Sequence, residues 1–164
     1  MSPRLRAVGI VAAVIVLDRV TKLYIQSAFS PLDTVEVISG FFNIVHVENP
    51  GAAWGLFGTV PEPWRRPALV GFSTLVMVVI SVMLFRPRTA ESALTQTGLA
   101  LVLGGAMGNL WDRAIRGTVT DFLQFFFGSY EYPSFNAADS AVFIGAVLLI
   151  LDSLRSRKRA PPVA

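Results

Sequence analysis

The amino-acid sequence predicts an all-α polytopic membrane protein with four transmembrane helices, a small extracytoplasmic β-sheet and an interfacial loop or helix. Hydrophobic residues make up 53% of the 164-residue chain, and its mean hydropathy is +0.58. Charged residues make up only 15%, against about 25% in soluble domains. Most of the basic residues lie beside long apolar stretches, as they do in chains whose helices are dissolved in a bilayer.

The first apolar stretch covers about residues 5–25. Its longest run without a charge is residues 7–17, and Asp18, Arg19 and Lys22 follow this run. A basic start and a short apolar run are also typical of a cleaved signal peptide. Asp18 and Lys22 are four residues apart and therefore share one face of a helix. This pairing favours a helix that stays in the protein.

Three further stretches complete the predicted bundle. Residues 67–85 and 93–111 each contain nineteen residues without a charge, which is long enough to span a hydrocarbon core of about 30 Å. Pro67 is expected at the start of its helix, where the missing N–H costs nothing. The fourth stretch covers about residues 137–154 and has Asp139 near its start.

The distribution of Lys and Arg sets the orientation, because the cytoplasmic flanks of membrane helices are rich in these residues. Residues 26–66 and 112–136 are then outer loops, and residues 155–164 form a charged cytoplasmic tail whose end is expected to be disordered. The pI near 9.8 reflects this orientation, and we expect no nucleic-acid partner. With both termini in the cytoplasm, eight of the fourteen basic residues lie inside: Arg4, Arg6, Arg86, Arg88, Arg155, Arg157, Lys158 and Arg159.

The first outer loop is predicted to contain a small antiparallel sheet on the membrane surface. Residues 35–38 and 42–47 are rich in β-branched and aromatic residues, and Gly40 lies between them. Residues 55–66 contain aromatic residues and two prolines, which is typical of a mobile segment at the membrane interface. Residues 123–127 in the second outer loop are similarly apolar.

The residue types that are missing exclude much hydrolytic chemistry. With no cysteine, the chain has no disulfide, no thiolate zinc site and no cysteine nucleophile. Its single histidine is His46, so a Ser-His-Asp triad would have to use that residue, and a two-histidine zinc motif is impossible. We expect neither a metal nor a cofactor.

Asp121 and Asp139 are the main candidates for catalysis. Each lies where a long apolar segment meets a polar loop, and a carboxylate at membrane depth costs about 2.5–3.5 kcal/mol on insertion scales. Two carboxyl groups at hydrogen-bond distance cannot both ionise easily, so one keeps a proton while the other activates water. Structural alternatives exist: Asn136 could cap the fourth helix with Asp139 in its first turn, and Asp121 could cap a short segment over residues 122–127.

Asp18 and Lys22 allow three interpretations. They could form an ion pair at the membrane interface that only orients the first helix, or they could organise a polar pocket beneath the outer loops. A neutral Lys22 could also act as the base for Ser140. An aspartate one turn away favours the charged lysine and therefore argues against this third interpretation.

The end of the third stretch combines small and polar residues. Gly104 and Gly108 form a GxxxG spacing that lets another helix approach closely. Asn109 and Arg113 are four residues apart; they either make packing and interface contacts, or hold a substrate backbone or a loop near the carboxylates. Asn49 begins a Pro-Gly turn, and its amide is a further candidate contact for an extended peptide.

Together, five segments resemble the lipoprotein signal peptidases, which are type II signal peptidases and aspartyl proteases of the bacterial inner membrane. The segments occur in the family's order and cover nearly the whole chain, which is expected to be a single integral membrane peptidase domain of residues 1–164. They are Asp18 to Lys22 with Thr21, Asn49-Pro50-Gly51-Ala52-Ala53-Trp54, and residues 104–113, 117–122 and 135–140.

The resemblance implies that Asp121 and Asp139 are the catalytic dyad. It also implies that the substrate is a prolipoprotein with diacylglycerol on its lipobox cysteine, and that the bond before this cysteine is cleaved. We expect a monomer in contact with membrane lipid, with its active site at the outer face of the inner (cytoplasmic) membrane. The site-supporting residues that the resemblance implies are Asp18, Lys22, Asn49, Gly105, Asn109, Arg113, Asn136 and Ala138.

Two rival functions stay open from the residues alone. One is a small transport or assembly protein that uses the carboxylates as a proton relay. The other is a peptidase with Ser140 as nucleophile and Lys22 as base.

Overall fold

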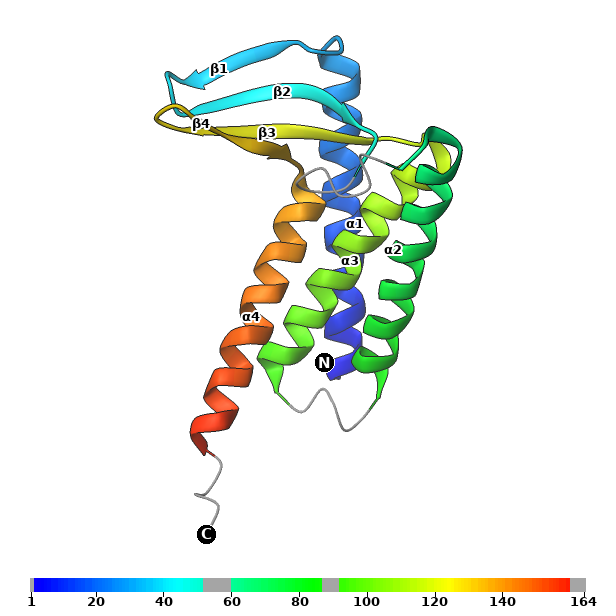
Figure 1. Ribbon diagram of the computed structural model, residues 1–164. Coiled ribbons are helices and arrows are strands. Elements are labelled where there is room, and N and C mark those ends of the chain that lie inside the picture. Colours follow the sequence, from blue (N-terminus) through cyan, green and yellow to red (C-terminus); the bar gives the residue numbers. More distant parts are fainter. Residues whose placement is uncertain (1, 52–59, 87–91, 160–164) are drawn as a thin grey trace.

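Four long helices run side by side, and a four-stranded sheet covers one end of them (Figure 1). The computed structural model describes residues 2–51, 60–86 and 92–159. Helix α1 begins and helix α4 ends at the side of the bundle away from the sheet (Figure 1). In chain order the elements are α1 (Pro3–Ala28), β1 (Thr34–Ile38), β2 (Phe42–Asn49), α2 (Glu62–Phe85), α3 (Ala93–Ile115), β3 (Val119–Phe127), β4 (Tyr130–Phe135) and α4 (Ala137–Arg159).

Local sequence determines where the helices begin. Ser2 accepts a hydrogen bond from the Leu5 N–H at the start of α1, at 3.2 Å. Ser92 accepts hydrogen bonds from the Leu94 and Thr95 N–H groups at the start of α3, at 3.1 and 3.2 Å. These serine caps satisfy N–H groups that have no partner inside the helix.

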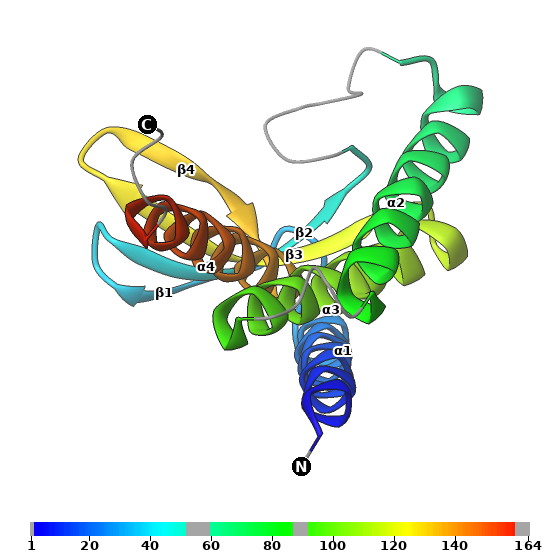
Figure 2. The same cartoon turned by 90° about the horizontal axis from the view of Figure 1, so that it is seen from below.

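Helix α3 is the centre of the bundle, with α1, α2 and α4 packed around it (Figure 2). Gly104 lies so close to α1 that an added Cβ would be 2.8 Å from the Val14 Cβ. Gly98 and Gly145 bring α3 and α4 together in the same way, with added Cβ atoms 2.9 and 2.6 Å from the opposite carbonyl oxygen. The close helix approach predicted from the GxxxG spacing is therefore confirmed.

The bundle interior is apolar in the half away from the sheet. Buried side chains of α1, α2 and α3 form one cluster there: Ala7, Leu84, Leu99, Ala100 and Leu103. Because close van der Waals packing drives the association of apolar helices, this half holds the helices together. The other half is then free to carry polar residues.

Two helices are by themselves long and apolar enough to cross a membrane, α2 over Pro63–Phe85 and α4 over Ala137–Ser156. Only 11% and 17% of their apolar 18-residue windows are buried inside the protein, so most of this surface is not covered by the rest of the chain. Among the described residues, α1 and α3 do not reach the same apolarity. Charges in α1, and glycines and polar residues in α3, lower their hydropathy.

The sheet is antiparallel throughout, in the order β1-β2-β3-β4. Gly40 and Gly128 form the hairpin turns, each with φ +65°, which glycine adopts without strain. Strands β2 and β3 pair in the middle of the sheet although α2 and α3 lie between them in the chain. This central pairing places Asp121 opposite Val47.

The sheet is larger than the sequence predicted. Strands β1 and β2 are confirmed, but β3 and β4 add a second hairpin, so the fold is not all-α. The alternative in which Asp121 caps a short segment is wrong, because Asp121 lies within β3. β-Branched and aromatic residues favour this strand, but its partner β2 comes from the other outer loop, which no local pattern reveals.

The helices also extend beyond their predicted ends. Helix α2 begins at Glu62, so Pro67 lies inside it and not at its start. Helix α3 runs to Ile115 and α4 to Arg159, into the predicted loop and tail. A charge marks where an apolar surface ends, whereas the helix continues until its backbone hydrogen bonding stops. The predicted limits therefore follow the uncharged runs and not the ends of the helices.

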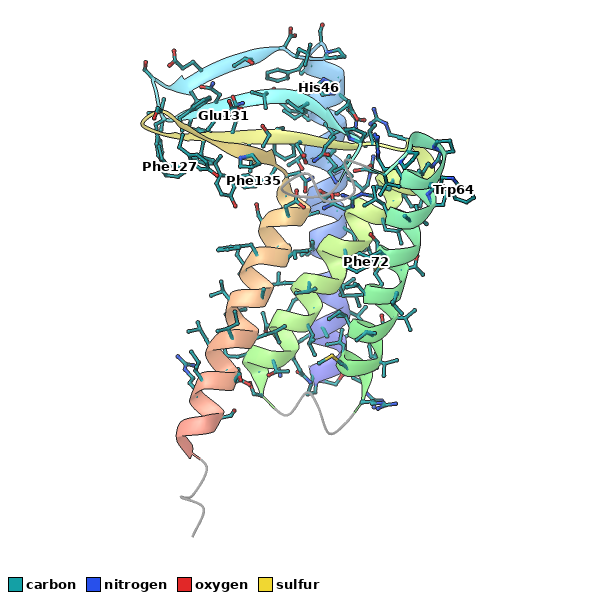
Figure 3. All side chains as sticks on the ribbon, viewed as in Figure 1. His46, Trp64, Phe72, Phe127, Glu131 and Phe135 are labelled. Carbon is teal, nitrogen blue, oxygen red and sulfur yellow. The ribbon has the colours of Figure 1, made fainter. Side chains whose placement is uncertain are left out.

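Aromatic side chains gather on the sheet. The Phe125 ring stacks on Phe42 and Phe135, with centroids 4.7 and 5.8 Å apart. Phe127 lies at the far end of the sheet from Trp64, which belongs to α2 and is 70% exposed, and Phe135 lies between them, just before α4 (Figure 3). Of the predicted interfacial segment of residues 55–66, residues 55–59 lie outside the described residues, and α2 begins at Glu62.

Gly145→Ala is expected to lower the thermal unfolding midpoint, because the added Cβ would meet the Gly98 carbonyl at 2.6 Å and the Val102 Cγ2 at 2.8 Å. Overpacking of this kind costs about 1–3 kcal/mol. Thermal unfolding of the purified protein in one detergent measures the effect.

Gly71→Ala is the matched control for this variant. Nothing lies within 4 Å of a Cβ at Gly71, and alanine favours a helix over glycine by about 1 kcal/mol. Equal midpoints for the two variants would contradict the close contact of α3 with α4.

Candidate active site

One residue, Asn136, is hydrogen-bonded to both candidate aspartates. Its amide nitrogen donates to Asp121 Oδ1 at 2.7 Å, and its backbone N–H donates to Asp139 Oδ2 at 3.2 Å. Asp121 comes from β3 and Asp139 from the first turn of α4, eighteen residues later. The structure therefore brings both carboxyl groups together where the sheet meets the bundle. We call Asp121 and Asp139 the aspartate pair.

The start of α4 explains the position of Asp139. Asn136 Oδ1 accepts a hydrogen bond from the Asp139 N–H at 3.0 Å, while Asp139 Oδ2 accepts one from the Asn136 N–H at 3.2 Å. This reciprocal arrangement is a capping box, in which each side chain satisfies the other residue's N–H. The predicted cap is therefore confirmed. It does not compete with a role in the site, because the same asparagine also binds Asp121.

Asn49 holds the other oxygen of Asp121. It ends β2, and its amide nitrogen donates to Asp121 Oδ2 at 3.0 Å. Its own oxygen accepts a hydrogen bond from the Gly51 N–H at 2.9 Å, which confirms the predicted turn. Arg113 of α3 donates to the Gly51 carbonyl at 3.1 Å, so Arg113 helps to orient this loop beside Asp121.

Asn109 makes the corresponding contact with Asp139. Its amide nitrogen donates to Asp139 Oδ1 at 2.7 Å. Its oxygen accepts hydrogen bonds from Lys22 at 2.9 Å and from Asn136 at 3.2 Å. Each carboxyl group of the aspartate pair is therefore held by two hydrogen bonds, which fix the direction of its oxygens.

Asp18 and Lys22 lie inside the protein, and both are 0% exposed. Lys22 Nζ lies 2.8 Å from Asp18 Oδ2 and 2.7 Å from Asp112 Oδ2. Complete burial excludes an exposed interface pair and supports the polar pocket. The Ser140 hydroxyl donates to the Asn136 carbonyl at 2.9 Å, and within the described part of the chain it makes no hydrogen bond with Lys22.

Gly105 and Ala138 allow α3 and α4 to approach at the level of the site. A Cβ added to Gly105 would collide with the Ala138 carbonyl oxygen. Ala138 is 0% exposed, and its N–H donates to Asp18 Oδ1 at 3.1 Å. Small residues at both positions therefore let Asp18 of α1 reach the start of α4.

The environment of the aspartate pair favours a bound proton. Burial, and then repulsion from the Asp139 carboxylate, raise the pKa of Asp121 to about 7, against the effect of hydrogen bonds from Asn49 and Asn136. Coupled carboxyl groups of this kind share one proton near neutral pH, and the apparent pKa belongs to the pair. One protonated and one ionised carboxyl together can activate a water molecule.

Two charged residues of the site were not singled out from the sequence. Arg19 forms an ion pair with Asp112, which also binds Lys22. Asp112 is 0% exposed. Both residues carried the signal that identified Asp18, namely a charge within or at the end of an apolar helix.

A second missed cluster lies beside Asp121 on the sheet. Glu48 accepts hydrogen bonds from the hydroxyls of Thr118 at 2.6 Å and Thr120 at 2.8 Å. His46 lies 3.2 Å from Glu48 and 2.9 Å from the Phe29 carbonyl. The histidine therefore connects the end of α1 to the sheet, which is a structural role and not that of a triad base.

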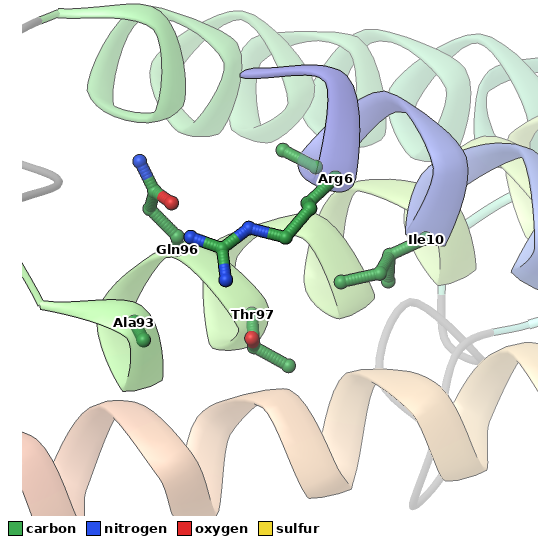
Figure 4. A pocket seen from close by; sticks show the side chains of 6 residues that line it. Arg6, Ile10, Ala93, Gln96 and Thr97 are labelled. Atoms are coloured by element: carbon green, nitrogen blue, oxygen red, sulfur yellow. The ribbon is translucent and has the colours of Figure 1, made fainter. Parts of the chain in front are cut away.

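A small pocket between α1 and α3 lies at the other end of the bundle, near the start of both helices. Figure 4 shows the Arg6 side chain reaching across it toward α3. The pocket is separate from the aspartate pair and is lined by Arg6, Ala7, Ile10, Ala93, Gln96 and Thr97.

The chain is similar to one family of proteins along nearly its whole length. A family model described as signal peptidase (SPase) II matches residues 10–155. A lipoprotein signal peptidase of Solibacter usitatus is 41% identical over 161 residues, which cover 98% of each chain. One of Maridesulfovibrio salexigens is 39% identical over 150 residues, which cover 91% of this chain and 96% of the relative.

The fold is also similar to that of a solved protein. A bacterial membrane enzyme determined by the in meso method at 2.3 Å resolution superposes with a TM-score of 0.78. The two chains are 29% identical, and the match covers 97% of this chain and 93% of the other.

Asp121→Asn is expected to change how stability depends on pH. Folding raises the pKa of Asp121 from 3.8 to about 7, so ionisation opposes folding. The stability contributed by the protonated carboxyl is complete below the unfolded pKa and is lost as pH rises through the folded value, by at most about 4 kcal/mol. The asparagine variant does not lose stability in this way, because its amide does not ionise.

Unfolding free energies of the two proteins at about pH 5 and about pH 8 test this dependence. The variant should gain stability relative to the wild type at the higher pH. A difference that does not change with pH would show that burial and Asp139 do not shift the ionisation of Asp121.

Proposed function

The chain belongs to the signal peptidase II family, and from that premise we propose that it removes the signal peptide from diacylglyceryl-modified prolipoproteins, with Asp121 and Asp139 as its catalytic residues. The observation that carries the assignment is the contact of Asn136 with both carboxyl groups, at 2.7 and 3.2 Å. Relatives named lipoprotein signal peptidase match nearly the whole chain, which supports the substrate class. Cleavage occurs immediately before the lipid-bearing cysteine.

The reaction follows from a shared proton. The ionised carboxyl of the aspartate pair takes a proton from a water molecule, whose oxygen attacks the scissile carbonyl carbon. The protonated carboxyl polarises the carbonyl oxygen and later gives its proton to the leaving amine. The enzyme forms no covalent intermediate, and the pair itself supplies both the acid and the base.

The neighbouring polar residues orient the pair and the substrate. Asn49, Asn109 and Asn136 each donate to one of the carboxyl groups, so they fix the oxygens that face the water. The buried Arg113 Nε has no hydrogen-bond partner among the described residues. It is available to a carbonyl of the extended substrate backbone.

All four helices cross the bacterial inner membrane, with both termini in the cytoplasm and the sheet outside. Their lengths of 23–26 residues correspond to about 34–39 Å, enough for a core of about 30 Å. Two charges within α1, Asp18 and Lys22, turn away from lipid, because both are completely buried. Basic residues at the end of the bundle away from the sheet support this orientation.

The sheet and the outer end of α2 lie at the membrane surface. Phe127 and Trp64 are 58% and 70% exposed and lie at a similar level on opposite sides of the bundle (Figure 3). Exposed aromatic residues at one level are typical of an interface belt. The lipid chains of the substrate stay in the bilayer while its peptide reaches the aspartate pair. The enzyme acts as a monomer with a single domain, residues 1–164.

The two rivals are less well supported. Lys22 is occupied by Asp18, Asp112 and Asn109, and Ser140 by the Asn136 carbonyl, so this lysine does not activate this serine. A proton-relay transporter would use the same carboxyl groups. Proton-coupled flux in proteoliposomes without peptide cleavage would select that function.

Asp121→Asn and Asp139→Asn are each expected to reduce cleavage by about 10²–10⁴-fold or more, because an amide serves neither as the base nor as the acid. The assay is cleavage of a diacylated prolipoprotein by purified enzyme in lipid, with the non-lipidated precursor as a second substrate.

Two variants serve as controls for this loss. Asp152→Asn removes the same charge at the other end of α4, where Asp152 accepts from the Thr95 hydroxyl at 2.6 Å. Ser140→Ala removes the rival nucleophile. Both should keep their activity, and turnover by either variant of the aspartate pair would refute the assignment.

The rate is expected to fall as pH rises through about 7, the value to which the pKa of Asp121 is raised. Above this pH the pair loses its shared proton, and with it the general acid. The pH profile of kcat/KM, measured with the diacylated substrate, reports this alkaline limb for the free enzyme. A rate that stays constant to about pH 9 would contradict a shared proton.

A further inference from the structure

The Lys22 ammonium lies between three acceptors beneath the aspartate pair. They are Asp18 Oδ2 at 2.8 Å, Asp112 Oδ2 at 2.7 Å and Asn109 Oδ1 at 2.9 Å. Lys22 donates hydrogen bonds to Asp18 and Asn109 and forms an ion pair with Asp112, whose Oδ2 accepts no hydrogen bond from the described residues. Asp18 pulls Lys22 toward its own helix, whereas Asp112 pulls it toward α3.

Arg19 completes this group on the opposite side of Asp112. It donates to Asp112 Oδ1, while Lys22 lies at Oδ2. The side chains of Asp112 and Arg19 are 1% and 22% exposed. The four residues Asp18, Arg19, Lys22 and Asp112, which we call the charge cluster, therefore carry two positive and two negative charges.

The charge cluster determines which way the Asn109 amide points. Because Lys22 can only donate, Asn109 must present its oxygen to it. The amide nitrogen then faces the opposite way and donates to Asp139 Oδ1 at 2.7 Å. If Lys22 moved away, the Asn109 oxygen would keep only the longer hydrogen bond from the Asn136 amide, at 3.2 Å, and would lose its charged donor.

We propose that Arg19 and Asp112 are positioning residues of the active site, because they hold Lys22 where its ammonium orients Asn109 toward Asp139. The proposal rests on the proposed function, in which Asp139 is one of the catalytic residues. A purely stabilising role explains the arrangement less well. Buried ion pairs add little net stability compared with well-packed apolar residues, and the other half of the same bundle is apolar.

The charge cluster also acts on the aspartate pair through its net charge. A positive charge nearby favours ionised carboxyl groups, and a negative charge favours the protonated form. The other charged groups near the pair come from α1, from α3 and its end, and from β2. They are Asp18, Arg19 and Lys22 of α1, Asp112, Arg113 and Arg116 of α3 and its end, and Glu48 of β2.

Single substitutions at Asp112 and Arg19 change this charge in opposite directions. Asp112→Asn leaves the charge cluster with one excess positive charge, so the alkaline limb of kcat/KM should move to lower pH. Arg19→Gln leaves one excess negative charge, so the limb should move to higher pH. Each shift is expected to be roughly half a unit or more at an effective dielectric constant near 20.

The double variant Arg19→Gln, Asp112→Asn has a neutral charge cluster again, and its limb should return to the wild-type position. We expect kcat to fall about tenfold or more in Asp112→Asn and in the double variant, with little change in KM, because Asn109 is no longer held in one orientation. If Asp112→Asn does not fold, Arg19→Gln still tests the direction of the shift.

Arg4→Gln and Asp152→Asn are the matched controls. They make the same charge changes on α1 and α4, at the end of the bundle away from the site, and should leave the limb unchanged. Limbs that stay in place in both site variants, or move in the same direction, would overturn the proposal. A merely structural ion pair would lower the amount of active enzyme without lowering kcat per active enzyme molecule.

Failure of this proposal can be told apart from failure of the proposed function. If Asp121→Asn retains turnover, the catalytic assignment fails first. If Asp121→Asn is inactive while the limbs of the Asp112 and Arg19 variants do not move, only the positioning role is wrong.

Discussion

The geometry of the site depends on one buried residue, Asn136, which belongs to two parts of the fold at once. Its oxygen and backbone N–H form the cap of α4, and its amide nitrogen holds Asp121 of β3. The residue is 0% exposed, so water cannot replace any of these bonds. A shift of α4 relative to the sheet would therefore break the hydrogen bond between Asn136 and Asp121. The same residue therefore fixes both the start of α4 and the position of Asp121.

The polar residues beneath this asparagine are arranged to limit the cost of burying charge. Isolated charges in a low-dielectric interior are expensive, whereas paired and hydrogen-bonded ones are tolerated. Asp18, Lys22 and Asp112 satisfy this requirement within a network that Arg19 balances at its edge. The network ends at Asn109, whose amide carries the orientation to Asp139. These buried charges are costly for stability, but they help to fix the orientation of the Asn109 amide, which donates to Asp139.

The two halves of the bundle have different roles: one packs the helices together, and the other holds the polar residues of the site. Away from the sheet, apolar residues such as Leu99 and Leu103 pack closely. Near the sheet, the small residues Gly105 and Ala138 let three helices meet around polar side chains. Such a division suits the proposed substrate, because its lipid and signal helix are apolar while the bond to be cut needs water. The site then lies at the boundary between the two environments.

The sequence by itself determined the four helices and the two acids, because both depend on local features. Apolar runs and capping residues predict helices, and a carboxylate at the end of an apolar run is costly enough to indicate a function. Only the tertiary structure decided the pairing of β2 with β3, the position of Asp121 within a strand and the ion pair of Arg19 with Asp112, which are 93 residues apart. Such contacts form between segments that packing brings together, and no periodic pattern in one segment specifies its distant partner.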